Sequence, residues 1–421
     1  MDINKTISRL EEVAKEYDRT VTEELEAEAE LKRGFGEITM EEIAQILSAT
    51  IKADDTNKKL TFLAQLSAFT PESQLNLASN SPSSTGKSYI SLEVSKLFPE
   101  DSVMKLGYAS PTSFFHEFGE YNKETHMKTI DLERKIIIFL DLPHPKLLER
   151  LRPILSHDQK EIESKITNSR KQRTERILMR GYSAFIFCSA NPKMDEQEAT
   201  RFILTSPDID SEKIKSAVIL KAKKEIQNNS FKEEIDSSPG RQELIKRIRA
   251  IRRANIKEIT IDIDTSHIVE SFIKKRRLQP RHTRDINKVL SLTKTIALLN
   301  LWTRQDEEGK LKATADDFKV ALGLWNKISE AQELNISPFC LEVFKKVFKP
   351  IAEEAKGFAA REEIARKYSE VYGRNISDWY LKKNIIPSWE NAGLTYTESD
   401  PLDRRKKVIF LSEGSNNHKT I

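Results

Sequence analysis

Cysteine is scarce in this chain of 421 residues, and long apolar runs are missing. The two cysteines, Cys188 and Cys340, lie far apart in sequence, so they offer neither a disulfide framework nor a cysteine-rich zinc site. No stretch approaches the roughly 18 uninterrupted apolar residues that suggest a membrane span. The opening residues MDINK lack the basic and apolar regions of a secretory signal. We therefore expect a cytoplasmic protein without membrane contact.

Charge of one sign does not dominate the sequence either, because the formal net charge is only +4. Hydrophobic residues make up 38% and charged residues 32%, which leaves enough apolar side chains for a core and excludes wholesale disorder. Residues 1–30 hold ten acidic and four basic residues, so the remainder carries a net charge of +10. This mildly basic remainder permits a nucleic-acid partner without requiring one.

Internal repeats are absent, and the length suggests two to four structural units at about 100–200 residues each. Residues 1–37 read as an acidic helical segment, and residues 38–210 alternate short apolar runs with amphipathic stretches. Such alternation predicts an α/β sheet with crossover helices. We expect strands at Gln74–Ser79, Ser102–Lys105, Lys135–Leu140 and Ala184–Ser189, and helices at Lys87–Leu97 and Pro145–Leu155.

The second half of the chain follows a different plan. Residues 211–335 are helical in pattern, with one strand-like interruption at Glu258–Ile263, which predicts a helical lid behind the α/β core. Residues 336–413 combine two helices and a two-stranded hairpin, which predicts a winged helix-turn-helix. Residues 414–421 read as a disordered tail. The candidates for this last domain are the helices Arg361–Tyr372 and Ser377–Asn391 and the strands Leu394–Thr397 and Lys407–Leu411.

The most specific motif is Ser81-Pro-Ser-Ser-Thr-Gly86-Lys87-Ser88, which follows a predicted strand and opens a predicted helix. It fits the Walker A pattern except that Ser81 occupies the first glycine position. Phosphate binding there needs backbone N–H groups, a lysine and a hydroxyl for Mg²⁺. A chance serine-rich loop is the alternative. The predicted residues for ATP are Ser83, Ser84, Thr85, Gly86, Lys87 and Ser88.

Polar side chains follow two further predicted strands. Asp141 ends the apolar run that begins at Lys135, where a carboxylate, together with the Ser88 hydroxyl, can hold Mg²⁺. Asn191 follows the strand that begins at Ala184, at the sheet edge where ligands bind in open α/β sheets. An ordinary capped core strand and an Asn-Pro turn are the competing interpretations.

These strand ends, in this order, resemble the AAA+ ATPases, specifically the minichromosome-maintenance helicase clade, over about residues 55–310. The resemblance implies an arginine finger at Arg201, within Thr200-Arg201-Phe202, and a sensor arginine that opens a lid helix. Arg281 is the first choice for that sensor and Arg284 the second. It further implies a ring, hexameric in the family, in which Asp141, Asn191, Arg201 and Arg281 serve catalysis.

One departure from this family concerns hydrolysis. Most AAA+ enzymes place Glu directly after the Walker B Asp, but Leu142 follows Asp141 here. Either hydrolysis is slow, or another carboxylate such as Glu117 serves, or Asp141 carries both roles. His144 is a further candidate, although a histidine between two prolines is more often structural. Nucleotide binding is therefore a safer prediction than turnover.

Basic residues point to DNA at two places. The resemblance puts a hairpin between residues 160 and 182, whose basic tip, with Lys171 and Arg173, would contact the DNA backbone in a salt-dependent way. In the predicted winged helix, Lys382 and Lys383 lie on the recognition helix, and Arg404 and Arg405 lie in the wing. A charged solvent loop and a protein-interaction module are the respective alternatives.

The leading hypothesis is thus an ATP- and Mg²⁺-dependent motor on single- or double-stranded DNA, a ring-forming helicase of a replication or mobile-element type. A second hypothesis is a DNA-binding transcription or defence regulator that binds ATP and barely hydrolyses it. A third, weaker one is a protein remodeller that does not use nucleic acid.

Overall fold

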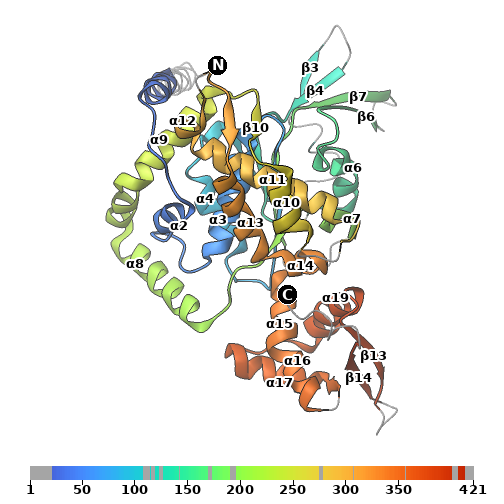
Figure 1. Ribbon diagram of the computed structural model, residues 1–421. Coiled ribbons are helices and arrows are strands. Elements are labelled where there is room, and N and C mark those ends of the chain that lie inside the picture. Colours follow the sequence, from blue (N-terminus) through green and yellow to red (C-terminus); the bar gives the residue numbers. More distant parts are fainter. Residues whose placement is uncertain are drawn as a thin grey trace, which may run out of the picture.

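The computed structural model describes residues 21–107, 114, 119–122, 127–141, 143–168, 173–189, 196–274, 278–306, 308–355, 357–400 and 406–412. Its centre is a five-stranded, all-parallel sheet with the order β2-β5-β8-β1-β9 (Figure 1). The predicted α/β sheet is therefore confirmed. Its strands are β1 (Leu77–Asn80), β2 (Val103–Leu106), β5 (Ile136–Phe139), β8 (Ala184–Ser189) and β9 (Ile203–Thr205).

Both faces of this sheet are covered, which explains why its central strands are continuous apolar runs. Along β5, Ile136 and Ile138 enter one core with helices α2, α3 and α4, whereas Ile137 and Phe139 enter a second core with α6. This alternation follows from the two-residue period of a strand. The helices around the sheet are α2 (Met40–Leu47), α3 (Asp55–Leu66), α4 (Lys87–Ser95), α6 (Pro145–Leu155) and α7 (Glu196–Ala199), with the 3-10 turns η1 (Ser67–Phe69) and η2 (Glu100–Ser102).

A second sheet projects from the core, with the order β3-β4-β7-β6 (Figure 1). Strands β6 and β7 form the hairpin that we predicted between residues 160 and 182, and β4 pairs with β7 in parallel. The pair β3 and β4 was not predicted from the sequence, because both strands are short and polar. The bounds are β3 (Glu120–Asn122), β4 (Met127–Asp131), β6 (Glu161–Asn168) and β7 (Arg173–Arg180).

The segment predicted as a lid is largely helical, and a long helix, α8, begins it. The strand expected near Glu258 is β10, which pairs in parallel with β11, a strand that the sequence did not predict. The elements are α8 (Ser211–Asp236), α9 (Pro239–Ala254), β10 (Ile259–Ile261), α10 (Thr265–Ile268), η3 (Val269–Ile273), α11 (His282–Leu299), α12 (Leu301–Arg304), β11 (Leu311–Ala313), α13 (Ala315–Asn326) and α14 (Ser329–Glu333).

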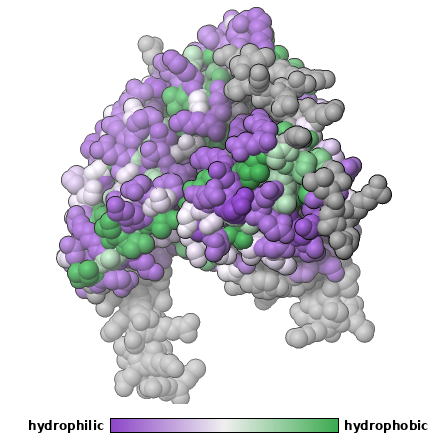
Figure 2. Space-filling model, turned by 90° about the horizontal axis from the view of Figure 1, so that it is seen from below, coloured by the Kyte–Doolittle hydropathy of each residue, from purple (hydrophilic) through white to green (hydrophobic). Residues whose placement is uncertain are grey.

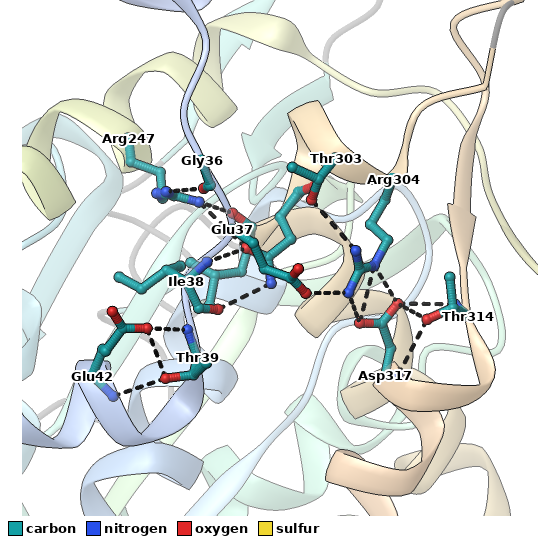
Figure 3. A network of polar contacts seen from close by, with 12 residues as sticks. Gly36, Glu37, Ile38, Thr39, Glu42, Arg247, Thr303, Arg304, Thr314 and Asp317 are labelled. Atoms are coloured by element: carbon teal, nitrogen blue, oxygen red, sulfur yellow. Dashed lines mark hydrogen bonds and ion pairs between the residues drawn. The ribbon is translucent and has the colours of Figure 1, made fainter.

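The helix over residues 21–33 and the segment after it are tied to this helical part. Figure 3 shows the Arg247 guanidinium donating to the Gly36 carbonyl at 2.6 Å, while Arg304 reaches Glu37 at 2.6 Å. Thr39 then begins α2 with a reciprocal capping box to Glu42. These contacts anchor the N-terminal part of the described chain to α9 and α12.

The C-terminal part has its own core, which the buried indole of Trp389 helps to fill. Its sheet is antiparallel, with the order β12-β14-β13, and includes the predicted hairpin. The elements are α15 (Pro338–Val343), η4 (Phe344–Phe348), α16 (Lys349–Glu354), β12 (Phe358–Ala360), α17 (Arg361–Tyr372), α18 (Asp378–Tyr380), η5 (Leu381–Ile385), α19 (Ile386–Asn391), β13 (Thr395–Ser399) and β14 (Lys407–Leu411).

Candidate nucleotide site and its surroundings

The loop between β1 and α4 has the backbone of an anion cradle. Ser84 and Gly86 both adopt positive φ, +64° and +97°, and Gly86 is the N-cap residue of α4 without any side-chain cap. Successive N–H groups in such a turn converge on one point, and the start of a helix adds its dipole. A Cβ added at Gly86 would meet no atom within 4 Å, so the space directly beside this residue is open.

The Lys87 side chain folds back against the loop between β1 and α4. Its ammonium donates to the carbonyl oxygens of Ser81 at 2.8 Å and Pro82 at 2.7 Å. Burial lowers the pKa of Lys87, while the nearby Cys188 and Asp141 act in the opposite direction. Lys87 is thus a nearly buried cation beside the loop over residues 81–86, the predicted phosphate loop.

The metal-binding candidates lie at the same carboxyl-terminal end of the parallel strands. Asp141 follows β5 and Ser88 opens α4, and the Ser88 hydroxyl donates to the Leu140 carbonyl at 3.4 Å. Among the described residues, no group of three or more His, Cys, Asp or Glu could hold a metal ion by itself. Two protein ligands suit Mg²⁺, which usually takes one or two carboxylates and completes its shell with phosphate and water. Ser88 and Asp141 are thus the side chains that would hold Mg²⁺ if ATP bound at this loop.

Several predicted residues fall outside the described part of the chain. These are Asn191, Glu117, Leu142, Lys171, Arg404 and Arg405, and of Arg173 only the backbone is described. His144 is described and has a structural role, because its Nδ1 accepts a hydrogen bond from the Lys146 N–H at 3.2 Å and caps α6.

The predicted arginine finger, Arg201, lies at the amino-terminal end of the parallel strands, opposite the end that carries Lys87 and Asp141. Arg201 precedes β9, whose Ile203 pairs with Leu77 at the start of β1. Burial and repulsion from Arg284 and Arg152 lower the pKa of Arg201. Arg284 also donates to the Thr200 hydroxyl. The structure therefore gathers basic side chains from α6 and α11 around the segment that carries Arg201.

Arg281, the first choice for the sensor, has a different environment. Its guanidinium forms a buried ion pair with Asp285 at 2.9 Å and donates to Asn335 at 2.7 Å. Lys288 also pairs with this carboxylate, at 3.5 Å. Because these partners occupy Arg281, Arg284 is the better placed of the two to act together with Arg201.

The described basic residues of the β6–β7 hairpin are largely paired. Arg176 makes two bonds to Glu163 at 2.8 and 2.9 Å, and Arg180 bonds Asp131 at 2.7 Å. On the described sides of the hairpin, these arginines are thus already paired with carboxylates.

The predicted recognition helix presents a basic face. Lys382 and Lys383 are exposed, and Trp379, three and four residues before them, is 64% exposed. Residues at these spacings share one face of a helix. Trp389 instead lies in the core, where its indole N–H donates to the Cys340 carbonyl at 2.8 Å.

Sequence reasoning missed the residues that surround the phosphate loop on its other side. Lys213, in the first turn of α8, donates to the Thr85 carbonyl at 3.4 Å and pairs with the buried Asp54. The Tyr89 hydroxyl donates to the Thr50 carbonyl at 2.8 Å. No spacing rule could have found these contacts, since they join segments far apart in sequence.

Comparison with known proteins adds no identity. No protein-family model matches the chain, and no curated protein matches its sequence. Among the described residues, no helix combines the length and the apolar character that crossing a membrane requires.

Proposed function

We propose that this chain is an ATP-dependent motor on DNA, built like the AAA+ ATPases and similar to the minichromosome-maintenance helicases. ATP would bind on residues 83–88, with Mg²⁺ on Ser88 and Asp141. The bound nucleotide supplies the phosphoryl group whose transfer to water drives such motors. The five-strand order and the left-handed turn at Gly86 that begins α4 support this proposal.

The observation that carries the proposal is that three features lie together at the carboxyl-terminal ends of the parallel strands. The glycine-containing turn, Lys87 and Asp141 come from two strands that β8 separates, yet the charge of Asp141 acts on the Lys87 ammonium. Lys87 would exchange the carbonyls of Ser81 and Pro82 for phosphate oxygens. Asp141, an exposed carboxylate, would hold the metal.

A second copy of the chain is part of the proposal. Ile203, two residues after Arg201, pairs with Leu77, and four strand positions, or about 13 Å at about 3.3 Å per residue, separate Leu77 from Ser81. Arg201 precedes β9, so from the opposite end of the strands it would not reach a nucleotide bound by its own chain. Arg201, with Arg284 beside it, would instead complete the site of a neighbouring copy.

The exposed face of α8 supports such a neighbour. This helix begins beside the phosphate loop and leaves Ile214, Val218 and Ile226 exposed by 45%, 63% and 82%. On the face seen in Figure 2, apolar side chains gather toward the left, the side on which α8 lies in Figure 1. A stripe of this kind is a typical contact surface for another protein.

The DNA contacts would come from two places. The C-terminal part combines helices with a three-stranded antiparallel sheet, the plan of a winged helix, and its Lys382 and Lys383 face solvent. The tip of the β6–β7 hairpin, with Lys171 and Arg173, is the second place. Arg404 and Arg405 would lie in the wing. Lysines and arginines there would bind phosphates without reading sequence.

Phosphate release measured with and without DNA tests this function. Wild-type protein should release phosphate from ATP faster when single- or double-stranded DNA is added, and Lys87→Ala should abolish the release. Lys96→Ala, which removes an exposed lysine from the end of the same helix, is the matched control. No DNA stimulation over a range of salt and strand types would contradict the motor.

A second candidate function is an ATP-operated DNA-binding switch that hydrolyses slowly. Two observations favour it: Leu142 stands where these ATPases have their catalytic Glu, and His144 is committed to capping α6. Tight ATP binding with little turnover, together with sequence-dependent DNA binding that is lost on deleting residues 336–421, would support the switch over the motor.

A further inference from the structure

The sheet order tells on which side of the phosphate loop a nucleoside would lie. Starting from β1, strand β5 lies on the side of β8, and β9 lies on the other side. Asp141 and the Ser88–Leu140 contact mark the β5 side, where the metal and the terminal phosphate would be. The nucleoside is attached to the opposite end of the triphosphate. It would therefore leave the loop on the β9 side.

On the β9 side, three segments are bonded to one another beside the phosphate loop: the turn over residues 48–54, the residues just after β9, and the start of α8. Asp208, just after β9, donates its N–H to the Asp54 carboxylate at 2.7 Å, and the Asp54 N–H donates to the Asp208 carboxylate at 3.2 Å. Lys213 pairs with Asp54 and reaches the Thr85 carbonyl of the phosphate loop. The turn over residues 48–54 and the start of α8 are thus both held next to the loop.

This turn is also strained. Ala53 and Asp54 are consecutive and both left-handed, with φ of +52° and +59°, and neither is glycine. Non-glycine residues are held in this conformation only where the surroundings determine it, and such positions concentrate at ligand sites. Here the surroundings are the reciprocal bonds with Asp208 and the hydrogen bond from Asn57 to the Asp54 carboxylate at 3.0 Å.

Tyr89 places an aromatic side chain against the turn over residues 48–54. It follows Ser88 directly in the first turn of α4, and its hydroxyl donates to the Thr50 carbonyl at 2.8 Å. The residue is nevertheless 41% exposed. The side chain is therefore fixed at its far end while part of its surface stays open.

We propose that the Tyr89 ring is the surface on which the nucleobase packs, which makes Tyr89 a specificity-determining residue of the site. This inference rests on the proposed nucleotide-binding function. A ring held at its hydroxyl loses little conformational freedom when a base stacks on it, and a purine offers the larger face. Tyr89 thus favours purine nucleotides and contributes nothing to a ligand that has no base.

Binding of ATP and of inorganic tripolyphosphate, each with Mg²⁺, tests this assignment by calorimetry. Tyr89→Ala should weaken ATP binding by about tenfold, equivalent to about 1.4 kcal/mol, and leave tripolyphosphate binding within about a factor of two. Tyr89→Phe, which keeps the ring, should restore most of the ATP affinity. Tyr396→Ala removes a comparably exposed tyrosine from the C-terminal sheet and should change neither ligand. Photolabelling with 8-azido-ATP should mark the peptide that contains Tyr89.

The outcomes separate this inference from the proposed function. Equal losses for ATP and tripolyphosphate in Tyr89→Ala, or no loss for either, would overturn the role of the ring while leaving nucleotide binding intact. Labelling confined to other peptides would do the same. A folded wild-type chain that takes up neither ligand would overturn the proposed function and this inference together.

Discussion

Arg247 is a buried residue that anchors the N-terminal segment of the described chain. The residue is 4% exposed, and its guanidinium donates to the carbonyls of Leu299 at 2.9 Å and Gly36 at 2.6 Å. Burial lowers its pKa to about 10, so it stays charged at neutral pH. The aromatic rings of Phe35 and Trp302 flank it.

Replacing this arginine should destabilise the fold. Arg247→Met keeps the length of the side chain but leaves the two carbonyls without their donor, at a cost of about 2–4 kcal/mol. Urea unfolding should show this loss as a lower midpoint. Arg249→Met, which removes only a partly exposed pair with Glu23, should change stability by about 0.5 kcal/mol or less. Equal effects of the two substitutions would contradict the anchoring role.

His157 should make the stability of the fold depend on pH in the acidic range. Its Nε2 lies 3.3 Å from the Ser183 carbonyl, and burial lowers its pKa to about 4. Between this value and the ordinary pKa of about 6.5, the unfolded chain binds a proton that the folded chain does not. Stability is therefore unaffected at neutral pH and falls as the pH drops through this window.

The size of that effect can be measured against a variant. At about 1.4 kcal/mol per pKa unit, His157 should remove at most about 3 kcal/mol between pH 6.5 and pH 4. His157→Asn tolerates the positive φ of this position and should flatten the dependence of the melting temperature on pH over that window. Parallel curves for wild type and variant would show that other groups cause the acid sensitivity.

At the scale of elements, the helix from Asp378 to Asn391 is the proposed reader of DNA. Lys382→Gln with Lys383→Gln should weaken DNA binding and reduce the slope of log affinity against log salt by about 2, because each lysine displaces about one counterion from duplex DNA. The matched control is Lys345→Gln with Lys367→Gln, which removes two lysines already paired with Glu330 and Glu370. An unchanged salt slope in the first variant would place the DNA elsewhere.

Elements with a strong local pattern could be predicted from the sequence, and pairings between distant segments could not. The strand at Ile136–Phe139 is an uninterrupted apolar run, and the start of α4 is marked by Gly86 and Lys87. By contrast, β9 has three residues and gains its identity only by pairing with β1. Short edge strands of this kind carry too few residues for a periodic signal.

The candidate site likewise divides into residues that local motifs predict and contacts that only the fold shows. The loop motif predicted Lys87 and Ser88, and the strand end predicted Asp141; their role in nucleotide binding stays a prediction. The choice between Arg281 and Arg284 was beyond the sequence, because both precede the same apolar helix and only the fold shows that Asp285 holds Arg281. Likewise, the sequence could not show that the acidic helix of residues 21–33 pairs with basic residues of α9, for example Glu30 with Lys246.

At the scale of the whole molecule, the account requires two copies for one complete site. Lys87→Ala and Arg201→Ala should each be nearly inactive alone, because a neighbour's arginine is worth about 10³–10⁵ in rate. Mixing the two variants should restore part of the DNA-stimulated activity, since some interfaces then combine an intact loop with an intact arginine. Activity that stays absent in every mixture, or Arg201→Ala protein that is fully active, would contradict the shared site.

The central claim, that the loop around Lys87 grips a triphosphate and that Asp141 holds its metal, is tested most directly by titrating ATP into the full chain in a calorimeter. The account predicts uptake of ATP with Mg²⁺, loss of this uptake in Lys87→Ala, and a weaker dependence on Mg²⁺ in Asp141→Asn. A well-folded wild-type chain that binds no ATP in the presence of Mg²⁺, or Lys87→Ala protein that binds it as tightly as wild type, would contradict the account.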